Sequence, residues 1–275
     1  MKKCFLIIIP VLILLCIYVL LKNKYAGPQE TKIIGNMSTP RVCANVLIKN
    51  NTMHIIGGYS SSSNVSKEEI FNLKDSQLKD YASHNVNMDN FDNNYIIVRN
   101  TVYNQKTGKE IIVKAKNLYV DNTSEIYELD YDMGTPVIVI VNKYNDQNPI
   151  QILYWNEDSF YDTTPKIPKE IKSYNLVSAF KLGLYEMSFI FTKGNDVYVV
   201  SYSGMDDYMR IIKHFKTKCS NTAFAYITDV FHKNILIYAV GGTQEDIYIK
   251  CPTDYKLVDK TICNTIEAIK FKRNY

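Results

Sequence analysis

The sequence is poor in the residue types that build most catalytic and metal-binding sites. It has one tryptophan, four histidines and four arginines among 275 residues. It contains no GxSxG, HExxH, P-loop or GxGxxG pattern, and no CxxC or Cys/His cluster with zinc spacing. His54 lies inside a predicted strand, and we interpret it as structural or exposed. The sequence therefore predicts no catalytic, cofactor-binding or metal-binding residue.

The sequence also lacks a long helical pattern after its N-terminal segment. No run of about 11 residues repeats its apolar positions with the 3.6-residue period of a helix. Tyrosine is common, at 22 residues, and isoleucine and asparagine are abundant, which favours strands joined by polar turns. Hydrophobic residues make up 46% of the chain and charged residues 22%, so we expect a folded core. Together these features predict an all-β fold.

An excess of one charge is absent beyond the N-terminal segment. The net charge of +4 is accounted for by four lysines near the N-terminus, so the rest of the chain is balanced; these are Lys2, Lys3, Lys22 and Lys24. A surface that follows nucleic-acid phosphates needs a local excess of lysine and arginine. Since the sequence shows no such stripe, we predict no nucleic-acid partner.

The one long apolar run lies near the N-terminus. Residues 4–21 are 18 consecutive uncharged positions, and as a helix they would span about 27 Å, close to the ~30 Å core of a bilayer. A cleaved signal peptide has a shorter apolar segment followed by a small-residue cleavage site, whereas Lys22 and Lys24 follow this one. We therefore predict an uncleaved transmembrane helix in the lipid bilayer. The predicted parts of the chain are a membrane anchor at 1–24, a short polar stalk at 25–40 and a folded domain at 41–275.

The charges that flank the apolar run predict the side of the membrane on which the domain lies. The α-amino group, Lys2 and Lys3 slightly outnumber Lys22 and Lys24, which favours a cytosolic N-terminus. The domain would then be lumenal, extracellular or on a virion surface. Four Asn-x-Ser/Thr sequons are possible glycosylation sites there: Asn36, Asn50, Asn64 and Asn122.

Four cysteines follow the apolar run and permit two disulfides. They are Cys43, Cys219, Cys251 and Cys263, and they allow three pairings that the sequence alone does not distinguish. Disulfides are typical of oxidising compartments, which agrees with a translocated domain. Separate buried thiols in a reducing compartment are the alternative interpretation.

Two short segments that end in a glycine pair indicate an internal repeat. Thr52–Tyr59 and Ile235–Gly242 are β-branched and aromatic runs, and their second glycines lie 184 residues apart, which is four steps of 46. A period of about 40–50 residues is typical of β-propeller blades. A strand must stop sharply at such a pair, so we expect positive φ or a close backbone approach. The positions concerned are Gly57, Gly58, Gly241 and Gly242.

The strands predicted between these glycine pairs follow a similar period. The third strand of each predicted unit is centred near residues 70, 112, 152, 199 and 248, with spacings of 42, 40, 47 and 49. They predict a five- to six-bladed β-propeller of four-stranded antiparallel blades, with a β-sandwich as the alternative. Residues 265–272 resemble the first strand of a further unit. With Lys32–Ile34 they are the candidates to close the ring.

The segment around the first glycine pair resembles a kelch repeat. Residues 36–75 contain, in order, Met37-x-x-Pro-Arg41, an apolar strand, an apolar-Gly-Gly strand end and Glu69-Ile-Phe71. Residues 223–250 are similar only in the glycine pair. The resemblance implies a β-propeller that binds another macromolecule through loops at one end of the ring.

These features predict a membrane-anchored binding module for a protein or a glycan. The candidate contact loops are Ser60–Lys67, Asn142–Pro149 and Thr243–Glu245. The alternative is a membrane-anchored propeller glycosidase or sialidase-like enzyme. That alternative requires Arg41, Arg99 and Arg210 to converge on a substrate carboxylate.

Overall fold

A computed structural model describes most of the chain after residue 28. In that part the structure is all-β, as predicted; its one helix is the short 3-10 helix η2 (Lys169–Ile171), and no sheet closes on itself. No helix in that part has the length and apolar character to cross a bilayer. The predicted transmembrane segment, residues 4–21, lies outside the described residues. The described residues are 29–49, 52–60, 63–73, 95–98, 101–104, 108–114, 118–120, 124–131, 135–142, 147, 149–156, 159–163, 165–182, 186–203, 209–228, 234–245, 249 and 261–272.

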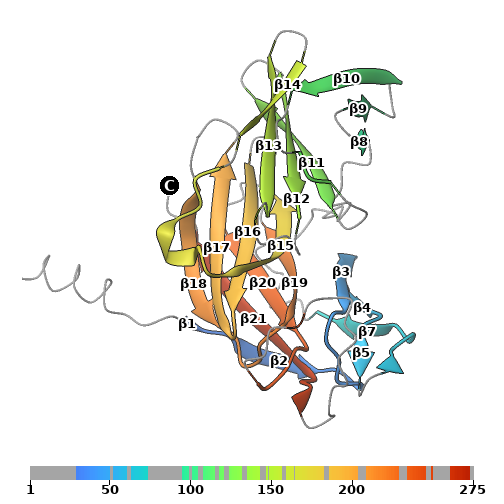
Figure 1. The fold of residues 1–275 in the computed structure, drawn as a ribbon. Coiled ribbons are helices and arrows are strands. Elements are labelled where there is room, and N and C mark those ends of the chain that lie inside the picture. The colour runs from blue at the N-terminus through green and yellow to red at the C-terminus, as the bar shows by residue number, and fades with distance from the viewer. Residues whose placement is uncertain are drawn as a thin grey trace, which may run out of the picture.

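The sheets are numbered one to five in the order of the predicted units along the chain. Sheet four is an antiparallel meander with one added strand (Figure 1). Strands β15 to β18 pair in sequence order, and β1 joins the outer edge in parallel, with Gln29 opposite Phe215. The third of these four strands, β17, contains residue 199, near which the third strand of the fourth unit is predicted. From the inner edge outward the strands are β15 (Asn175–Lys181), β16 (Glu186–Lys193), β17 (Asp196–Ser203), β18 (Arg210–Lys216) and β1 (Gln29–Glu30).

Sheet five joins the two ends of the described chain. Its C-terminal strand pairs with an N-terminal strand, with Lys32 opposite Ala268, which confirms the predicted partners. The C-terminal strand is, however, the third strand of this sheet, in place of the strand predicted near Ile249, which lies outside any strand. The folded part also begins by Gln29, within the predicted stalk. The order is β19 (Ala223–Thr228), β20 (Asn234–Val240), β21 (Thr265–Lys272) and β2 (Lys32–Asn36).

Sheets two and three are joined into one seven-stranded sheet. Strand β10 pairs in parallel with β14, with Val113 opposite Phe160, a pairing that the sequence did not predict. The four-strand repeat predicts a fourth strand of the second unit at Leu118–Val120, but these residues are not a strand, so that prediction was wrong. Sheet three contains β11 (Glu125–Tyr131), β12 (Thr135–Val141), β13 (Ile150–Asn156) and β14 (Ser159–Thr163), and sheet two contains β8 (Tyr95–Val98), β9 (Thr101–Asn104) and β10 (Lys109–Lys114).

Sheet one has three strands and is accompanied by a separate hairpin. It is an antiparallel sheet in which His54 lies between Leu47 and Ile70 in register. A two-stranded hairpin follows its second strand and falls within the predicted Ser60–Lys67 loop. The sheet consists of β3 (Asn45–Lys49), β4 (Thr52–Ile56) and β7 (Glu69–Asn72), and the hairpin of β5 (Tyr59–Ser60) and β6 (Ser63–Asn64).

The central sheets are buried on both faces, which explains their uninterrupted apolar sequences. In β20, Ile235 and Ile237 pack in a cluster with sheet four, whereas Leu236 and Tyr238 pack in a cluster with sheet one. Side chains alternate between the two faces of a strand, so a strand between two sheets needs apolar residues at successive positions. Sheet four is likewise packed between sheets three and five.

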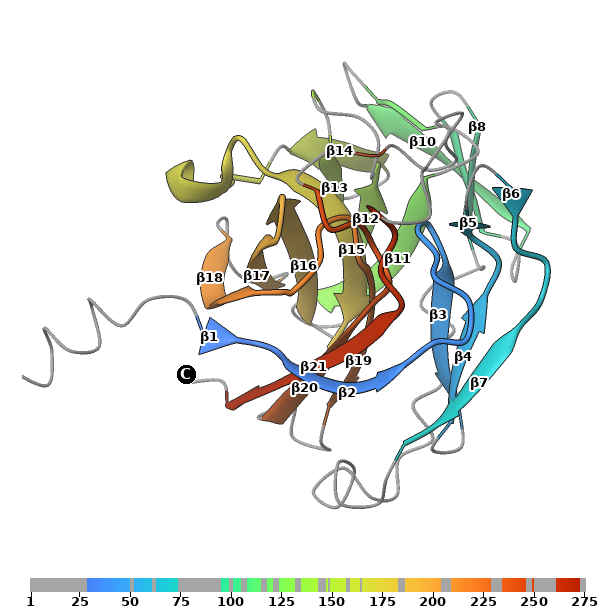
Figure 2. The same cartoon turned by 90° about the horizontal axis from the view of Figure 1, so that it is seen from below.

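The sheets succeed one another around the molecule in chain order, as the view from below shows in projection (Figure 2). The first strands of sheets three, four and five also contact one another directly. The Tyr127 hydroxyl donates to the carbonyl of Ala179 at 3.1 Å, and the Tyr226 hydroxyl donates to the carbonyl of Lys181 at 2.8 Å. These bonds connect β11 to β15 and β19 to β15.

Both glycine pairs have the backbone geometry predicted from the sequence. Gly57 and Gly58 have φ of 67° and 93°, and Gly241 and Gly242 have φ of 66° and 103°. A Cβ atom would lie 2.6 Å from the carbonyl oxygen of Val42 at Gly58, and 2.1 Å from the corresponding atom of Ser220 at Gly242. Positive φ and close backbone approach are therefore both confirmed.

The two glycine turns also share a pattern of backbone pairing. Tyr59, after the first pair, forms an isolated antiparallel bridge with Val42, and Thr243, after the second, forms one with Ser220. Each partner residue precedes the first strand of its own sheet and is followed by a residue with left-handed backbone. These two residues are Cys43, with φ of 57°, and Asn221, with φ of 52°.

A pair of alanine substitutions separates the two physical demands on these glycines. Gly57 and Gly241 have nearly equal φ, but a Cβ would meet no heavy atom within 4 Å at Gly57 and the Arg41 oxygen at 2.2 Å at Gly241. We expect Gly57→Ala to lower the free energy of unfolding by about 1 kcal/mol and Gly241→Ala by roughly 2 kcal/mol more. Urea denaturation measures both, and equal losses would contradict the crowding argument.

Candidate functional site

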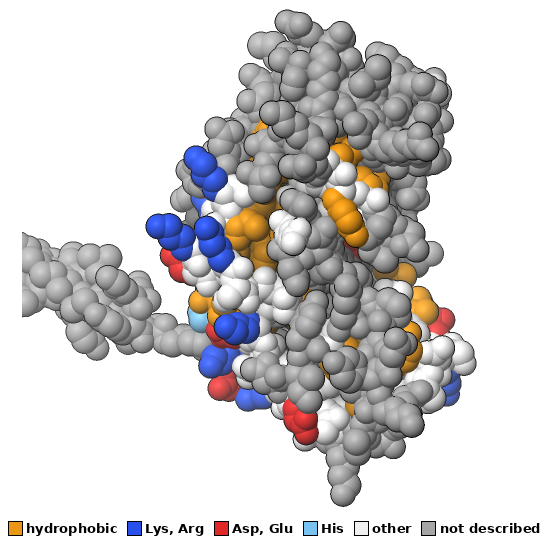
Figure 3. All heavy atoms as spheres, viewed as in Figure 1, with side chains coloured by type: hydrophobic (Ala, Val, Ile, Leu, Met, Phe, Trp, Pro, Cys, Tyr) orange, Lys and Arg blue, Asp and Glu red, His pale blue; other side chains and the backbone are white. Residues whose placement is uncertain are grey.

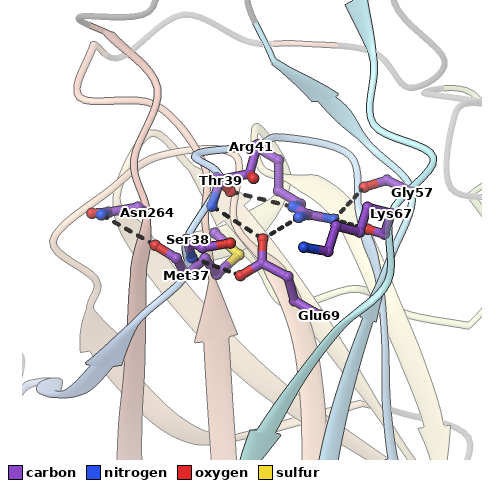
Figure 4. A network of polar contacts seen from close by, with 8 residues as sticks. All are labelled: Met37, Ser38, Thr39, Arg41, Gly57, Lys67, Glu69 and Asn264. Carbon is purple, nitrogen blue, oxygen red and sulfur yellow. Dashed lines mark hydrogen bonds and ion pairs between the residues drawn. The ribbon is translucent and has the colours of Figure 1, made fainter.

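Arg41 is the most completely buried charged side chain near the predicted contact loops. Its guanidinium donates to the carbonyls of Gly57 at 3.1 Å, Lys67 at 3.0 Å and Thr39 at 3.3 Å, and forms an ion pair with Glu69 (Figure 4). The side chain is 0% exposed. Because Gly57 and Lys67 are the two ends of one loop, Arg41 fixes the base of that loop.

Glu69 completes this network from the third strand of sheet one. Its carboxylate accepts hydrogen bonds from the backbone N–H groups of Ser38 at 2.6 Å and Thr39 at 3.1 Å. Burial alone would raise the pKa of Glu69, but these hydrogen bonds and the Arg41 charge outweigh it and lower the pKa. Glu69 is therefore the ionised partner that the buried guanidinium requires.

The segment that carries Arg41 also binds the turn of sheet five. The backbone N–H of Gly242 donates to the carbonyl of Arg41 at 3.0 Å, and the N–H of Arg41 donates to the carbonyl of Cys263 at 3.3 Å. The N–H of Met37 donates to the carbonyl of Asn264 at 2.6 Å. The residues of the kelch-like pattern thus connect sheet one to sheet five at the glycine turns.

One predicted pairing of the cysteines is present. Cys219 and Cys263 form a disulfide across 44 residues of sequence, and it links the start of sheet five to the start of β21. Cys43 is also disulfide-bonded. Cys251 lies outside the described residues. The Cys219–Cys263 bond leaves one of the three pairings that the sequence allowed.

The described residues of the Ser60–Lys67 loop, which leave out residues 61–62, are joined by hydrogen bonds. The Val65 N–H donates to the Gly58 carbonyl at 2.8 Å, and the Ser63 hydroxyl donates to the Ser60 carbonyl at 2.8 Å. Within this loop, four described residues present exposed side chains: Ser63, Asn64, Ser66 and Lys67. This loop therefore has the accessibility that the contact prediction requires.

The other two predicted contact loops begin with buried residues. Asn142 is 2% exposed and donates to the Tyr119 carbonyl at 3.3 Å, and Thr243 is 2% exposed and accepts from Asn221 at 2.9 Å. These two residues are structural, so they cannot contact a partner as predicted. Gln244 and Glu245 are exposed, whereas residues 143–146 lie outside the described residues.

A polar cluster on the outer part of sheet four was not found by sequence reasoning. The Tyr174 hydroxyl donates to Asp196 at 2.9 Å, His214 Nε2 lies 2.9 Å from the other carboxylate oxygen, and Tyr198 stacks on His214. Burial, followed by the hydrogen bond and charge of Asp196, raises the pKa of Tyr174. No sequence signal could reveal it, because the four residues come from three separate segments.

No group of three or more His, Cys, Asp or Glu side chains that could hold a metal ion gathers in the described part of the chain. His54 lies between Thr52 and Glu68, at 2.9 Å and 2.7 Å, in agreement with a structural interpretation. Arg41 is buried and hydrogen-bonded within its own network, whereas Arg210 is exposed on β18. These two arginines therefore do not converge as a sialidase site requires. Arg99 lies outside the described residues.

Two of the four sequons are visible in the structure. Asn36 at the end of β2 and Asn64 in β6 both have exposed side chains, so both are accessible to modification. Asn50 and Asn122 lie outside the described residues.

Comparison with known proteins identifies no family for this chain. No family model matches the sequence, and no curated protein is a significant match. One solved structure that matches the chain weakly is the extracellular domain of a protein described as a hybrid two-component system from B. thetaiotaomicron. The identity is 9%, the TM-score is 0.33, and the match covers 87% of this chain but 39% of that one. A similarity at this level carries no conclusion, so the kelch resemblance stays a prediction.

Proposed function

We propose that the chain is a membrane-anchored β-propeller, similar to kelch proteins, that binds another protein through the loop Ser60–Lys67. The observation that carries this proposal is the Arg41 clamp, in which the guanidinium donates to the carbonyls of Gly57, three residues before that loop, and of Lys67, its last residue. Binding residues are commonly found on loops that a rigid scaffold positions. A loop ordered in advance also loses less conformational entropy when a partner binds.

The propeller arrangement is supported by how the sheets pack. Sheets three, four, five and one contact in that order through shared clusters, and β2 completes sheet five from the other end of the chain. The remaining face of sheet one exposes three large apolar side chains, Leu47, Ile56 and Ile70. In a five-bladed ring this face is the one that sheet two covers. The apolar sequences of β8 and β10 suit that role.

A lumenal or extracellular location for the domain is supported by the Cys219–Cys263 disulfide. Cytosolic thiols are kept reduced in most cells, whereas disulfides persist in secretory and extracellular compartments. The long apolar run at residues 4–21 supplies the anchor in this proposal. A protein partner would then be found on the non-cytosolic side.

If sheet two closes the ring against sheet one, a charge introduced on the covered face of sheet one should destabilise the fold. Ile70 is 60% exposed and Ile33, on the outer strand β2, is 52% exposed, so the pair is matched in residue type and accessibility. If sheet two covers Ile70, Ile70→Asp should lower the free energy of unfolding by about 2 kcal/mol, because a carboxylate becomes buried. Ile33→Asp should stay within about 0.5 kcal/mol. Equal, small effects would reject closure at this face.

The binding role predicts a selective effect of changes in the clamped loop. Ser63→Arg with Lys67→Glu alters exposed side chains and leaves the backbone carbonyls that Arg41 contacts. We expect this variant to lose at least tenfold in affinity, about 1.4 kcal/mol, for a partner isolated with the wild-type chain. Ser173→Arg with Lys32→Glu is the control on exposed positions elsewhere. Undiminished partner binding by the loop variant would exclude this loop as the contact.

The proposed location predicts protection of the domain in sealed membranes. When the full chain is synthesised with microsomes, we expect added protease to digest it only after detergent opens the vesicles. Asn64 should carry a glycan that Asn64→Gln removes, because its side chain is exposed in the folded domain. Digestion without detergent would place the domain in the cytosol and reject the location.

A further inference from the structure

The outer part of sheet four carries a concentration of basic side chains that the balanced overall charge does not reveal. Six exposed lysine and arginine residues lie on β18 and on the segment around η2, and Figure 3 shows basic side chains gathered over these elements. We call this surface the basic face. Its residues are Lys166, Lys169, Lys172, Arg210, Lys216 and Lys218.

The two segments of the basic face are held together at both ends. The backbone N–H of Met209, beside Arg210, lies 3.5 Å from the carbonyl oxygen of Lys166. At the other end Tyr174 donates to Asp196, which is opposite Lys216 in the β17–β18 register. The lysines of the η2 segment and those of β18 therefore form one continuous surface.

Few acidic groups among the described residues offset this charge. Glu30 pairs with Lys218 at 2.9 Å, and Asp196 is occupied by Tyr174 and His214. Glu170 and Glu186 are the other carboxylates that are at least partly exposed among the described residues of the η2 segment and sheet four. The six cations thus exceed these four carboxylates by two charges. Such a surface attracts an anionic partner within about one Debye length, or ~8–10 Å.

The path of the chain brings this surface close to the proposed membrane anchor. Strand β1 lies along β18, with Glu30 opposite Lys216, so the chain enters the fold at the outer edge of sheet four. Seven residues, 22–28, separate β1 from the apolar run. Fully extended, they span about 25 Å at most. Sheet four is therefore the sheet that the tether holds nearest to the bilayer.

We propose that the basic face lies against anionic phospholipid headgroups in the non-cytosolic leaflet of the membrane that residues 4–21 cross. This inference rests on the proposed membrane anchor and adds the orientation of the domain on it. Figures 1 and 2 both place β18 and β5 on opposite sides of the molecule. The clamped loop that begins at β5 consequently points away from the lipid, where a protein partner can reach it.

The test measures the acylation rate of lysines in the full chain reconstituted into nanodiscs. One set contains phosphatidylcholine alone, and the other contains about 30% phosphatidylglycerol, which gives the surface a negative potential. We expect Lys169, Lys172 and Lys216 to react at least about threefold more slowly on the anionic nanodiscs. Lys67, exposed on the far loop, is the internal control and should react equally on both.

A charge-reversal variant, Lys169→Glu with Lys172→Glu and Lys216→Glu, completes the test. In this variant Lys166 and Lys218 should lose the lipid-dependent protection that they show in the wild type, and about 0.5 M salt should remove the wild-type protection as well. Equal rates on the two lipid compositions would overturn the proposal. A chain that does not enter nanodiscs would instead refute the anchor. Protection by soluble heparin, without protection by anionic lipid, would assign the basic face to acidic glycans and overturn the bilayer proposal.

Discussion

The buried guanidinium of Arg41 is the constraint around which the loop end of the molecule is arranged. A buried cation with unmet hydrogen bonds costs several kcal/mol, so its donors determine where the neighbouring acceptors must lie. Here they hold the carbonyls of Gly57 and Lys67, and Glu69 supplies the countercharge. The Arg41 carbonyl in turn accepts from Gly242. One residue therefore couples the loop of sheet one to the turn of sheet five.

The same coupling explains why the kelch-like pattern contains these particular residues. Gly241 and Gly242 allow the backbone of sheet five to approach the segment at Arg41, since a side chain at Gly241 would collide with the Arg41 carbonyl. Glu69 must be on the third strand because its carboxylate reaches Ser38, Thr39 and the guanidinium together. The pattern therefore describes a junction between sheets.

Strand positions could be predicted where burial on both faces imposes an apolar run. The strand predicted near residue 199 and the apolar run that begins at Ile235 fall in β17 and β20, whose successive side chains pack against different sheets. Pairings between distant segments were harder. The β10–β14 contact is parallel and joins residues more than 40 positions apart, and nothing in the local sequence specifies such a partner.

The candidate site likewise combines features that the local sequence predicts with features that depend on distant contacts. Positive φ at the glycine pairs followed from local sequence, because two glycines at the end of an apolar strand favour a backbone turn that residues with a Cβ atom rarely adopt. The burial of Asn142 and Thr243 could not be foreseen, since polar residues in turns usually face water and here they satisfy backbone groups inside the fold. The Cys219–Cys263 pairing likewise depends on β21 lying beside β20, a long-range contact.

The N-terminal strands fix where the chain enters the fold. Sheet five is completed by β2 and sheet four by β1, so the segment leading from the N-terminus crosses the outside of two adjacent sheets before it reaches Arg41. A tether that pulled on this segment would act on strand pairs, and the hydrogen bonds of β2 with β21 lie between it and the Arg41 network. In the proposed arrangement, the loop clamped by Arg41 would be isolated from motion of the tether. A binding loop with a fixed base, on the side opposite the tether, would keep its geometry while the domain is held near a surface.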